Sequence, residues 1–341
     1  MSVATELTRI QTAKSNIKAA IEAKGVSIPS TATIDTYPTY VQEIPQGGGS
    51  GETKDYFKIT NRTATAGTVT FTQSGSVYNL KLKISSDGTN WDNYDMSATT
   101  TVTLPANGYI MLDGSENIMW SYNGNQRWQI NADVDHDVSG KISTLLGNTM
   151  SIAFSYLFFK NTHLIDASNL SLNYSILNSS SYNHMFFGCT GLTSAPALPA
   201  MVLGDNCYQN MFTSCHSLTT APALPATNLA NKCYHSMFNN CTGLTTAPEL
   251  PATTLATYCY SNMFAQCTNL ATAPVLPASA LTNYCYEYMF TYSQITSIIC
   301  LAMTTANRAT QNWVNAINTT GILYVASGNS MNWTQGSNGY P

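Results

Sequence analysis

The apolar positions in the C-terminal part of the chain recur with a period of 26 residues. Each unit carries Met-Phe, then Cys, Leu, the segment Ala-Pro-x-Leu-Pro-Ala, a further Leu, and Cys-Tyr. One unit cannot bury these side chains alone, whereas stacked copies bury them against the same positions of their neighbours. The period therefore predicts a solenoid over 139–341, and its length is typical of leucine-rich repeats. The Met-Phe pairs begin at Met185, Met211, Met237, Met263 and Met289.

We expect each coil of this solenoid to hold one short strand and one helical turn. In the first full unit the strand falls near Leu192–Thr193 and the helical turn near Cys207–Phe212. Prolines such as Pro196 lack an N–H donor and favour extended backbone before them, so they should lie between the two. The degenerate unit before residue 182 and the tail from Ala302 are expected to cap the open core.

A different pattern occupies residues 1–46, where apolar side chains follow a heptad spacing. A single helix with so narrow a stripe cannot bury it alone. We therefore expect a helical segment that joins copies of the chain, with a homotrimer favoured and a dimer also compatible. The alternative is that the stripe packs on the rest of the same chain. A Gly-rich linker over 47–54 follows, and the assembly stripe consists of Leu7, Ile10, Ile17 and Ile21.

Between these regions, residues 55–138 alternate apolar and polar side chains over short runs separated by turn residues. The run Leu80–Lys81–Leu82–Lys83–Ile84 shows the alternation that one half-buried sheet face requires. Six or seven such runs predict an antiparallel β-sandwich. The predicted fold class is thus multidomain: an N-terminal helical oligomerisation stalk, an antiparallel β-sandwich, and a C-terminal leucine-rich-repeat solenoid with caps.

Charge narrows the range of partners. Only 9% of the residues are charged, against roughly 25% in an average domain. The 14 Lys and Arg form no cluster, which disfavours a nucleic-acid partner. No apolar run is long enough to cross a membrane, and Met1–Ile10 has no secretory h-region, so we expect neither membrane insertion nor secretion.

The nine cysteines come in alternating gaps of 8 and 18 residues. Each recurs once per unit, so the simplest interpretation is a buried thiol stacked on its own copy. Disulfides and a zinc site remain alternatives, although zinc sites use shorter gaps. Ser181 and Ser293 replace a cysteine at the two ends of the array. We expect no metal and no cofactor.

Catalytic chemistry finds little support. No nucleophile elbow, P-loop or dinucleotide fingerprint occurs. Between 181 and 300 the only acids are Asp205, Glu249 and Glu287, too few and too scattered for paired carboxylates. We therefore expect no enzyme and name no catalytic residue, although a depolymerase in the β-rich region is kept as a minor alternative.

The Tyr after each second Cys is the candidate ligand-facing position. Such a column could face solvent and contact a sugar or protein, or lie half-buried with its hydroxyls at the rim. The sequence leaves both interpretations open, whereas the Met-Phe stripe is interpreted as core. The column consists of Tyr208, Tyr234, Tyr260 and Tyr286.

The motif Met-Phe-x-x-Cys-x-x-Leu-x-x-Ala-Pro-x-Leu-Pro-Ala resembles the BspA-like leucine-rich repeats of surface proteins from gut Bacteroidales and their phages. The resemblance covers about 155–300, and Ala13–Val26 is similar to the N-terminal segment of phage tail and fibre proteins. Together they imply a non-enzymatic virion fibre protein, on a tail or a head. Its N-terminus would contact other virion proteins, and its repeats would contact a host cell-surface glycan or protein. The alternative is a bacterial cell-surface adhesin with the same repeats.

Overall fold

The computed structural model describes residues 54–74, 81–96, 99–114, 127–145, 154–317 and 321–329, together with Lys18 and Trp333. Contacts divide the chain into two units, Met1–Lys54 and Asp55–Pro341. The predicted assembly stripe and the linker up to residue 53 lie outside the described residues. Among the described residues, no helix has the length and apolar character needed to cross a bilayer.

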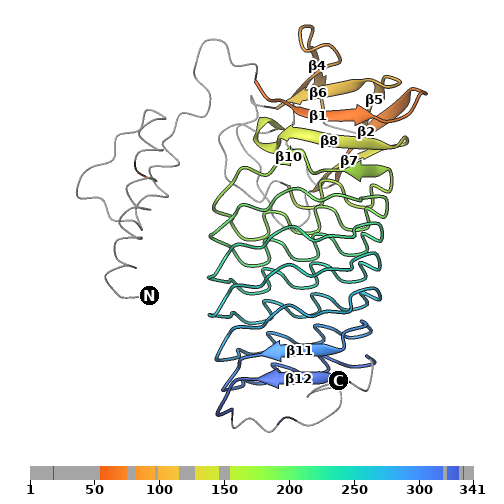
Figure 1. Ribbon diagram of the computed structural model, residues 1–341. Coiled ribbons are helices and arrows are strands. Elements are labelled where there is room, and N and C mark those ends of the chain that lie inside the picture. The colour runs from red at the N-terminus through yellow and green to blue at the C-terminus, as the bar shows by residue number, and fades with distance from the viewer. Residues whose placement is uncertain are drawn as a thin grey trace. The chain divides into compact units, whose positions relative to one another are not determined.

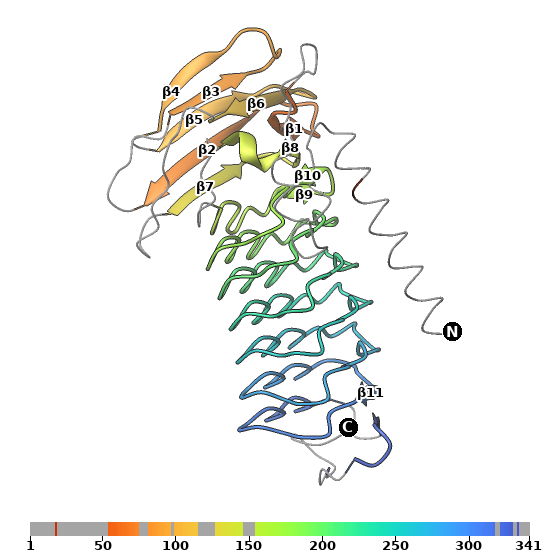
Figure 2. The same cartoon turned by 90° about the vertical axis from the view of Figure 1, so that its left-hand side faces the viewer.

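The second unit begins with two sheets, called the head. The larger sheet has the order β10-β8-β1-β6-β3-β4, with β9 also paired to β8. The smaller sheet is antiparallel and has the order β5-β2-β7 (Figures 1 and 2). The strands are β1 (Phe57–Asn61), β2 (Gly67–Ser74), β3 (Lys81–Ser85), β4 (Asp92–Asp95), β5 (Thr100–Leu104), β6 (Tyr109–Asp113), β7 (Arg127–Ala132), β8 (His136–Lys141), β9 (Leu164–Asp166) and β10 (Leu170–Ser171).

Alternating side chains explain why these segments pair. In β1 the side chains of Phe57, Ile59 and Asn61 are buried while the two between them are half-buried. This period of two gives the sheet one inner face. Phe71 of β2 stacks on Trp128 of β7 with ring centroids 5.8 Å apart, so the smaller sheet contributes to the same core.

Strand β8 joins the head to the repeats. It pairs antiparallel with β1 and parallel with both β9 and β10, which belong to the first, degenerate repeat. The predicted boundary after residue 138 therefore falls inside β8, and the sheet continues across it. Gly140 of β8 has φ of +79°, and a Cβ there would collide with the carbonyl oxygen of Tyr56. Only glycine allows this close approach.

From residue 154 onward the chain forms coils stacked one upon another (Figure 1). Equivalent residues of successive coils form isolated parallel bridges, such as Val202 with Asn228 and Asn228 with Thr254. Phenylalanine rings stack in register through the middle, with Phe212 and Phe238 5.6 Å apart and only 3° from parallel. The apolar side chains that recur every 26 residues thus pack against their own copies, and many have no exposed surface.

The segment from Asn206 to Cys215 shows how each coil is held. Alternate N–H groups donate in two directions. Asn206, Tyr208 and Asn210 donate to carbonyls of the next coil, at 2.9–3.0 Å. The intervening Cys207 and Gln209 donate three residues back within their own coil, at 3.3 Å. An α-helix would send every N–H to its own chain four residues back, so this segment cannot be helical.

Every fourth residue of these segments has a positive φ. Asn206, Asn210 and Ser214 have φ of 59°, 56° and 60°, and the same three positions recur in the following coils. Left-handed backbone costs about 1–2 kcal/mol for a residue with a side chain. From Tyr156 to Tyr292, each of these residues donates its N–H to a carbonyl of the next coil at 2.7–3.2 Å, which offsets that cost.

The predicted fold class is wrong. From residue 54 onward the described chain consists of strands and turns, with one 3₁₀ helix, Ile142–Leu145, and no α-helix. The larger sheet is mixed and runs into the repeats, so the head is not a separate antiparallel sandwich. The repeats are not a leucine-rich-repeat solenoid with a helical turn in each coil. The expected strand at Leu192–Thr193 is a single bridge at Ser194, because only one residue there reaches the neighbouring coil.

The C-terminal end of the stack is covered by aromatic rings. The parallel pair β11 (Ser297–Cys300) and β12 (Ile322–Val325) belongs to the last coils. Trp313 has no exposed surface and stacks on Trp333 with ring centroids 5.7 Å apart. The region from Ala302 thus includes the residues that close the apolar core, as caps of repeat proteins do.

Candidate binding face

The tyrosines named from the sequence are not ligand-facing. Tyr208, Tyr234, Tyr260 and Tyr286 are each about 1% exposed, so both the solvent-facing and the half-buried interpretation are corrected. Their rings stack at 5.7–6.0 Å as a second aromatic column of the core. Among the described residues, the hydroxyls of Tyr208 and Tyr234 have no hydrogen-bond partner. The Tyr column is therefore structural.

A different set of side chains points outward. We call the side chains of the positive-φ residues of the stack the left-handed face. Twenty non-glycine residues have a positive φ, and all except Asn107 of the head belong to this face. None of them is buried, whereas the two residues that follow each of them are mostly buried. They form three columns across the coils: Ser180, Asn206, Lys232, Tyr258, Tyr284 and Arg308; then Tyr156, His184, Asn210, Ser236, Asn262, Tyr288 and Asn312; then Lys160, Ser214, Asn240, Gln266, Tyr292 and Ala316.

The chemistry of this face is uniform. Apart from Ala316, each member is an amide, a hydroxyl, a tyrosine, a histidine or a cation, and none is acidic. Gly188 occupies the remaining place in the third column, with φ of +71°. Asn tolerates left-handed backbone better than most residues, but tyrosine and lysine have no such preference. Backbone geometry therefore does not account for the tyrosines and cations.

Tyrosines gather at the C-terminal half of the face. Tyr258 and Tyr284 stack with ring centroids 4.4 Å apart and planes 3° from parallel. Tyr288 and Tyr292 follow at the other two left-handed positions of the same coil as Tyr284, and Tyr292 is 55% exposed. Exposed tyrosines combine an apolar ring with a polar hydroxyl, which suits recognition of sugars and proteins.

Cations extend the tyrosine stack at both ends. The Lys232 ammonium lies 5.3 Å from the centroid of Tyr258, and the Arg308 guanidinium lies 5.2 Å from that of Tyr284. Arg308 also bonds Glu287 at 2.8 Å. Burial raises the pKa of the Glu287 carboxyl, and Arg308 opposes that shift. The pKa of Tyr258 is raised too, first by desolvation and then by Tyr284 and Glu287.

All nine cysteines are free and buried, as the buried-thiol interpretation expects. The thiol of Cys241 donates to the carbonyl of Phe212 in the preceding coil at 3.0 Å, and Cys189, Cys215 and Cys267 do the same. Desolvation raises the pKa of the Cys233 and Cys267 thiols to about 12. Such thiols stay protonated near neutral pH and are poor nucleophiles and metal ligands.

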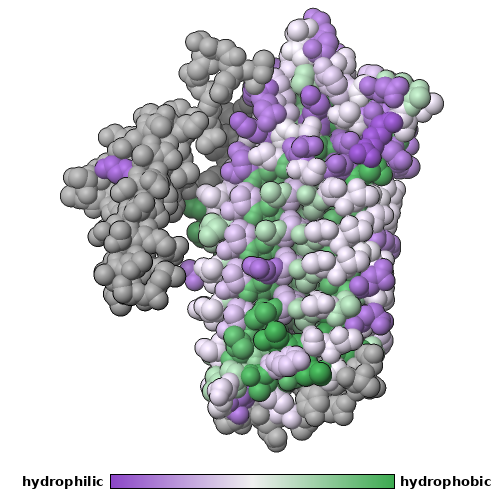
Figure 3. Space-filling view, in the orientation of Figure 1, coloured by the Kyte–Doolittle hydropathy of each residue, from purple (hydrophilic) through white to green (hydrophobic). Residues whose placement is uncertain are grey.

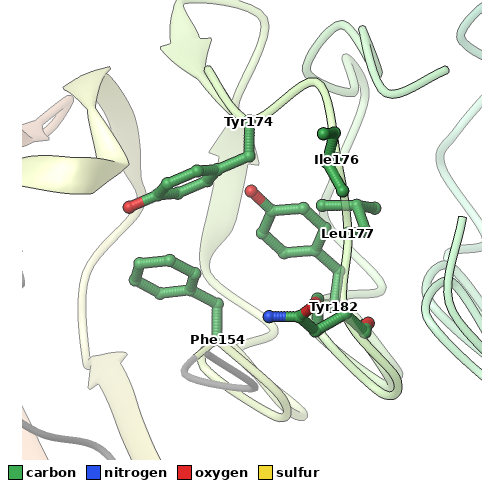
Figure 4. A pocket seen from close by; sticks show the side chains of 7 residues that line it. Phe154, Tyr174, Ile176, Leu177 and Tyr182 are labelled. Atoms are coloured by element: carbon green, nitrogen blue, oxygen red, sulfur yellow. Dashed lines mark hydrogen bonds between the residues drawn. The ribbon is translucent and has the colours of Figure 1, made fainter. Parts of the chain in front are cut away.

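Two hollows offer weaker candidates. A cavity of about 20 Å³ lies beside Tyr182, between Phe154, Tyr174 and Leu177 (Figure 4), and has room for a single water molecule. A wider hollow of about 390 Å³ over β3 and β4 is lined by Lys81, Lys83, Asp95 and Asp113. Its two positive and two negative side chains favour no ligand charge. Within the described residues, no three His, Cys, Asp or Glu side chains gather as metal ligands would.

An apolar surface occurs on the last coils. Figure 3 shows apolar side chains gathered on the face that carries β11 and β12. The exposed members are Val275, Ile299, Leu301, Ile322, Tyr324 and Val325. This surface differs from the left-handed face in chemistry, because it has one tyrosine and otherwise aliphatic side chains.

Reasoning from the sequence missed the left-handed face because it followed the 26-residue period alone. A second spacing, of four residues, lies within each unit and selects the outward positions. The recurrent Asn and Ser at 206, 210, 214, 236 and 240 are the trace of it in the sequence. The comparisons add no guide to function: known protein families, curated proteins and solved structures contain no match to the chain.

Proposed function

We propose that this chain is a non-enzymatic binding protein, a component of a virion fibre that contacts a glycan or protein on a host cell surface. The contact is made by the left-handed face. The resemblance of the repeat motif to BspA-like surface proteins, and of Ala13–Val26 to phage fibre proteins, supports the virion assignment.

One observation carries the binding role. Tyr258, Tyr284, Tyr288 and Tyr292 occupy four left-handed positions in two successive coils, beside amide side chains such as Asn262. Large aromatic side chains at solvent-accessible positions supply contact area with little loss of conformational entropy. Amides and hydroxyls around them supply donors and acceptors for a polar ligand.

The chemistry of the remaining polar groups also supports binding over catalysis. The cysteine thiols have raised pKa values and no solvent access. Glu287 is engaged by Arg308, and Glu249 lies at an exposed position in a different part of the coil. The arrangement thus lacks the pair of facing carboxylates that glycoside cleavage requires.

Whole-cell binding tests this proposal. Fluorescently labelled full-length protein would be incubated with a panel of gut Bacteroidales, and bound protein measured by flow cytometry. We expect saturable binding to some strains, with Tyr288→Ala/Tyr292→Ala reducing affinity by about tenfold or more, because central aromatic contacts contribute most.

The matched control is Tyr324→Ala. Tyr324 on β12 is 53% exposed, close to the 55% of Tyr292, but does not belong to the left-handed face. Equal loss in both variants, or a loss only in Tyr324→Ala, would place the contact elsewhere. Release of oligosaccharides from purified capsular polysaccharide would contradict a non-enzymatic role.

A further inference from the structure

Charges are segregated on the stack. Residues 154–317 contain three Lys or Arg, and all three are on the left-handed face: Lys160, Lys232 and Arg308. The same residues contain four acids, and none has a positive φ: Asp166, Asp205, Glu249 and Glu287. This separation occurs in a chain whose net charge is −4. Nothing in left-handed backbone favours lysine or arginine, so the folding of the coils does not explain it.

Each of these cations rests on an aromatic ring of the stack. Lys160 lies 5.3 Å from the ring centroid of Phe159, as Lys232 does from Tyr258 and Arg308 from Tyr284 at 5.2 Å. All three side chains are nevertheless exposed. Cation–π contact holds the stem of a long side chain while its charged end stays in water. The cations are therefore positioned on the face and accessible to a ligand.

The cations also recur at regular intervals. Inter-coil hydrogen bonds lead from Lys160 through Gly188 and Ser214 to the coil of Lys232, which is three coils further on. Three more coils, through Tyr258 and Tyr284, lead to Arg308. At about 4.8 Å per coil the cations are roughly 14 Å apart along the stack. Between them the face presents hydroxyls and amides.

We propose that the left-handed face binds an anionic glycan laid along the stack, with Lys160, Lys232 and Arg308 each contacting an acidic group. This inference rests on the proposed binding role of the face and names the ligand class. Tyrosine, Asn and Ser side chains between the cations hydrogen-bond and contact the sugar rings. One cation about every third coil fits a polymer whose charges are well separated.

The density of charge argues against nucleic acid. Double-stranded DNA carries one charge per about 1.7 Å of axis, and its partners neutralise many phosphates with clustered Lys and Arg. Three cations roughly 14 Å apart cannot do this. The abundance of neutral donors and acceptors on the face matches the hydroxyls of a sugar chain instead.

Binding to immobilised glycans tests the proposal with the full-length chain. The probes are alginate and hyaluronan for carboxylates, dextran sulfate for sulfates, dextran as a neutral polymer, and duplex DNA. We expect at least one anionic glycan to bind about tenfold more tightly than dextran, and its binding to weaken between low and high salt. Lys160→Gln/Lys232→Gln should weaken that binding by about fivefold, since exposed charge pairs contribute modestly.

Two further variants keep the test sharp. Adding Glu287→Gln/Arg308→Gln removes the third cation together with its acidic partner, so that no unpaired carboxyl is left, and should weaken binding further. The control, Lys58→Gln/Lys141→Gln, removes two lysines of the head, one of which also lies over a ring, 4.7 Å from Tyr109. It should leave binding unchanged.

The outcomes separate this inference from the proposed function. Preference for alginate or hyaluronan over dextran sulfate would assign the acidic groups to carboxylates, and the reverse preference to sulfates. Equal binding to dextran, tighter binding to DNA, or equal losses in the control variant would overturn the inference. If cells were bound through Tyr288 and Tyr292 but no anionic glycan were, this inference alone would fail. If cells were not bound either, the proposed function would fail with it.

Discussion

Two sets of tyrosines in this protein have opposite environments although they alternate along the chain. Tyr284 and Tyr286 are two residues apart, yet Tyr286 is 1% exposed and Tyr284 lies on the outer face with an arginine over its ring. Both sets stack on copies one coil away. The difference is the sign of φ: Tyr284 has φ of +60°, and Tyr286 does not belong to the positive set.

The comparison shows that two periods act on one segment. The 26-residue period places equivalent residues one above another, so like packs on like. The four-residue period of positive φ decides which residues turn outward. A residue type therefore says little about its role here, whereas its position within the group of four says a great deal.

The largest expected effect comes from truncating one tyrosine of each set. Tyr260→Ala removes a fully packed ring of the core and should lower the free energy of unfolding by about 3–5 kcal/mol. Tyr258→Ala removes a partly exposed ring and should cost about 1 kcal/mol or less. Urea denaturation followed by circular dichroism would measure both, and similar losses would show that the two sets do not differ in packing.

An intermediate effect is expected from the backbone rather than the ring. Ser236 has φ of +55°, so Ser236→Val places a β-branched residue in left-handed backbone and should cost about 1–2 kcal/mol. Ser236→Gly should be neutral or stabilising. Asn239→Val, three residues away at a half-buried position without a positive φ, is the control. Thermal unfolding would rank the three, and an equal shift for both valines would contradict the role assigned to φ.

A similar contrast between inside and outside applies to histidines, with a pH-dependent effect. His136 is buried; its Nδ1 donates to the Val134 carbonyl at 2.9 Å and its Nε2 accepts from the Asn161 amide at 3.2 Å. Desolvation lowers its pKa, against the opposing influence of the Val134 carbonyl, Asp137 and Asp135. The unfolded state therefore binds the proton more readily, and stability should fall as pH drops below about 6.5.

Unfolding measured between pH 8 and pH 5 would test this. His136→Gln should show a shallower decline than the wild type. His216→Gln, at an exposed position, should keep the wild-type slope. An unchanged slope in His136→Gln would assign the decline to other groups, among them His235, whose pKa is also lowered by burial.

The smallest effect is expected from removing a single atom of the Tyr column. The Tyr234 hydroxyl is buried and has no partner among the described residues. A buried hydroxyl without a hydrogen bond is unfavourable, so Tyr234→Phe should be neutral or stabilise by up to about 1 kcal/mol. A clear loss of stability would show that the hydroxyl is satisfied in solution.

The sequence predicted the stacking of like residues but not the path of the chain between them. The apolar period located Phe212, Phe238 and Cys241 in the core, because burial follows directly from hydrophobic pattern. It gave a helical turn at Cys207–Phe212, because a run with two buried residues in every four resembles helical spacing. Hydrogen bonds between coils, which link residues far apart in sequence, decided for turns instead.

The candidate site was the least predictable part. The recurrence of Cys-Tyr drew the choice to Tyr208, Tyr234, Tyr260 and Tyr286, but strict recurrence is a mark of the core. Tyr258, Tyr288 and Tyr292 recur little or not at all, because outward positions are free to vary. The sign of φ, which no hydrophobic pattern reports, was needed to recognise them as one face.

Chemical modification of tyrosines tests the central claim most directly. Full-length protein would be nitrated under native conditions with and without a bound cell-surface ligand, and modified residues identified by mass spectrometry. The account predicts nitration at Tyr288 and Tyr292, protection of both by the ligand, and no modification at Tyr208, Tyr234, Tyr260 or Tyr286 until the protein unfolds. Modification of the Tyr column in the native protein, or a bound ligand that leaves Tyr288 and Tyr292 fully reactive, would contradict it.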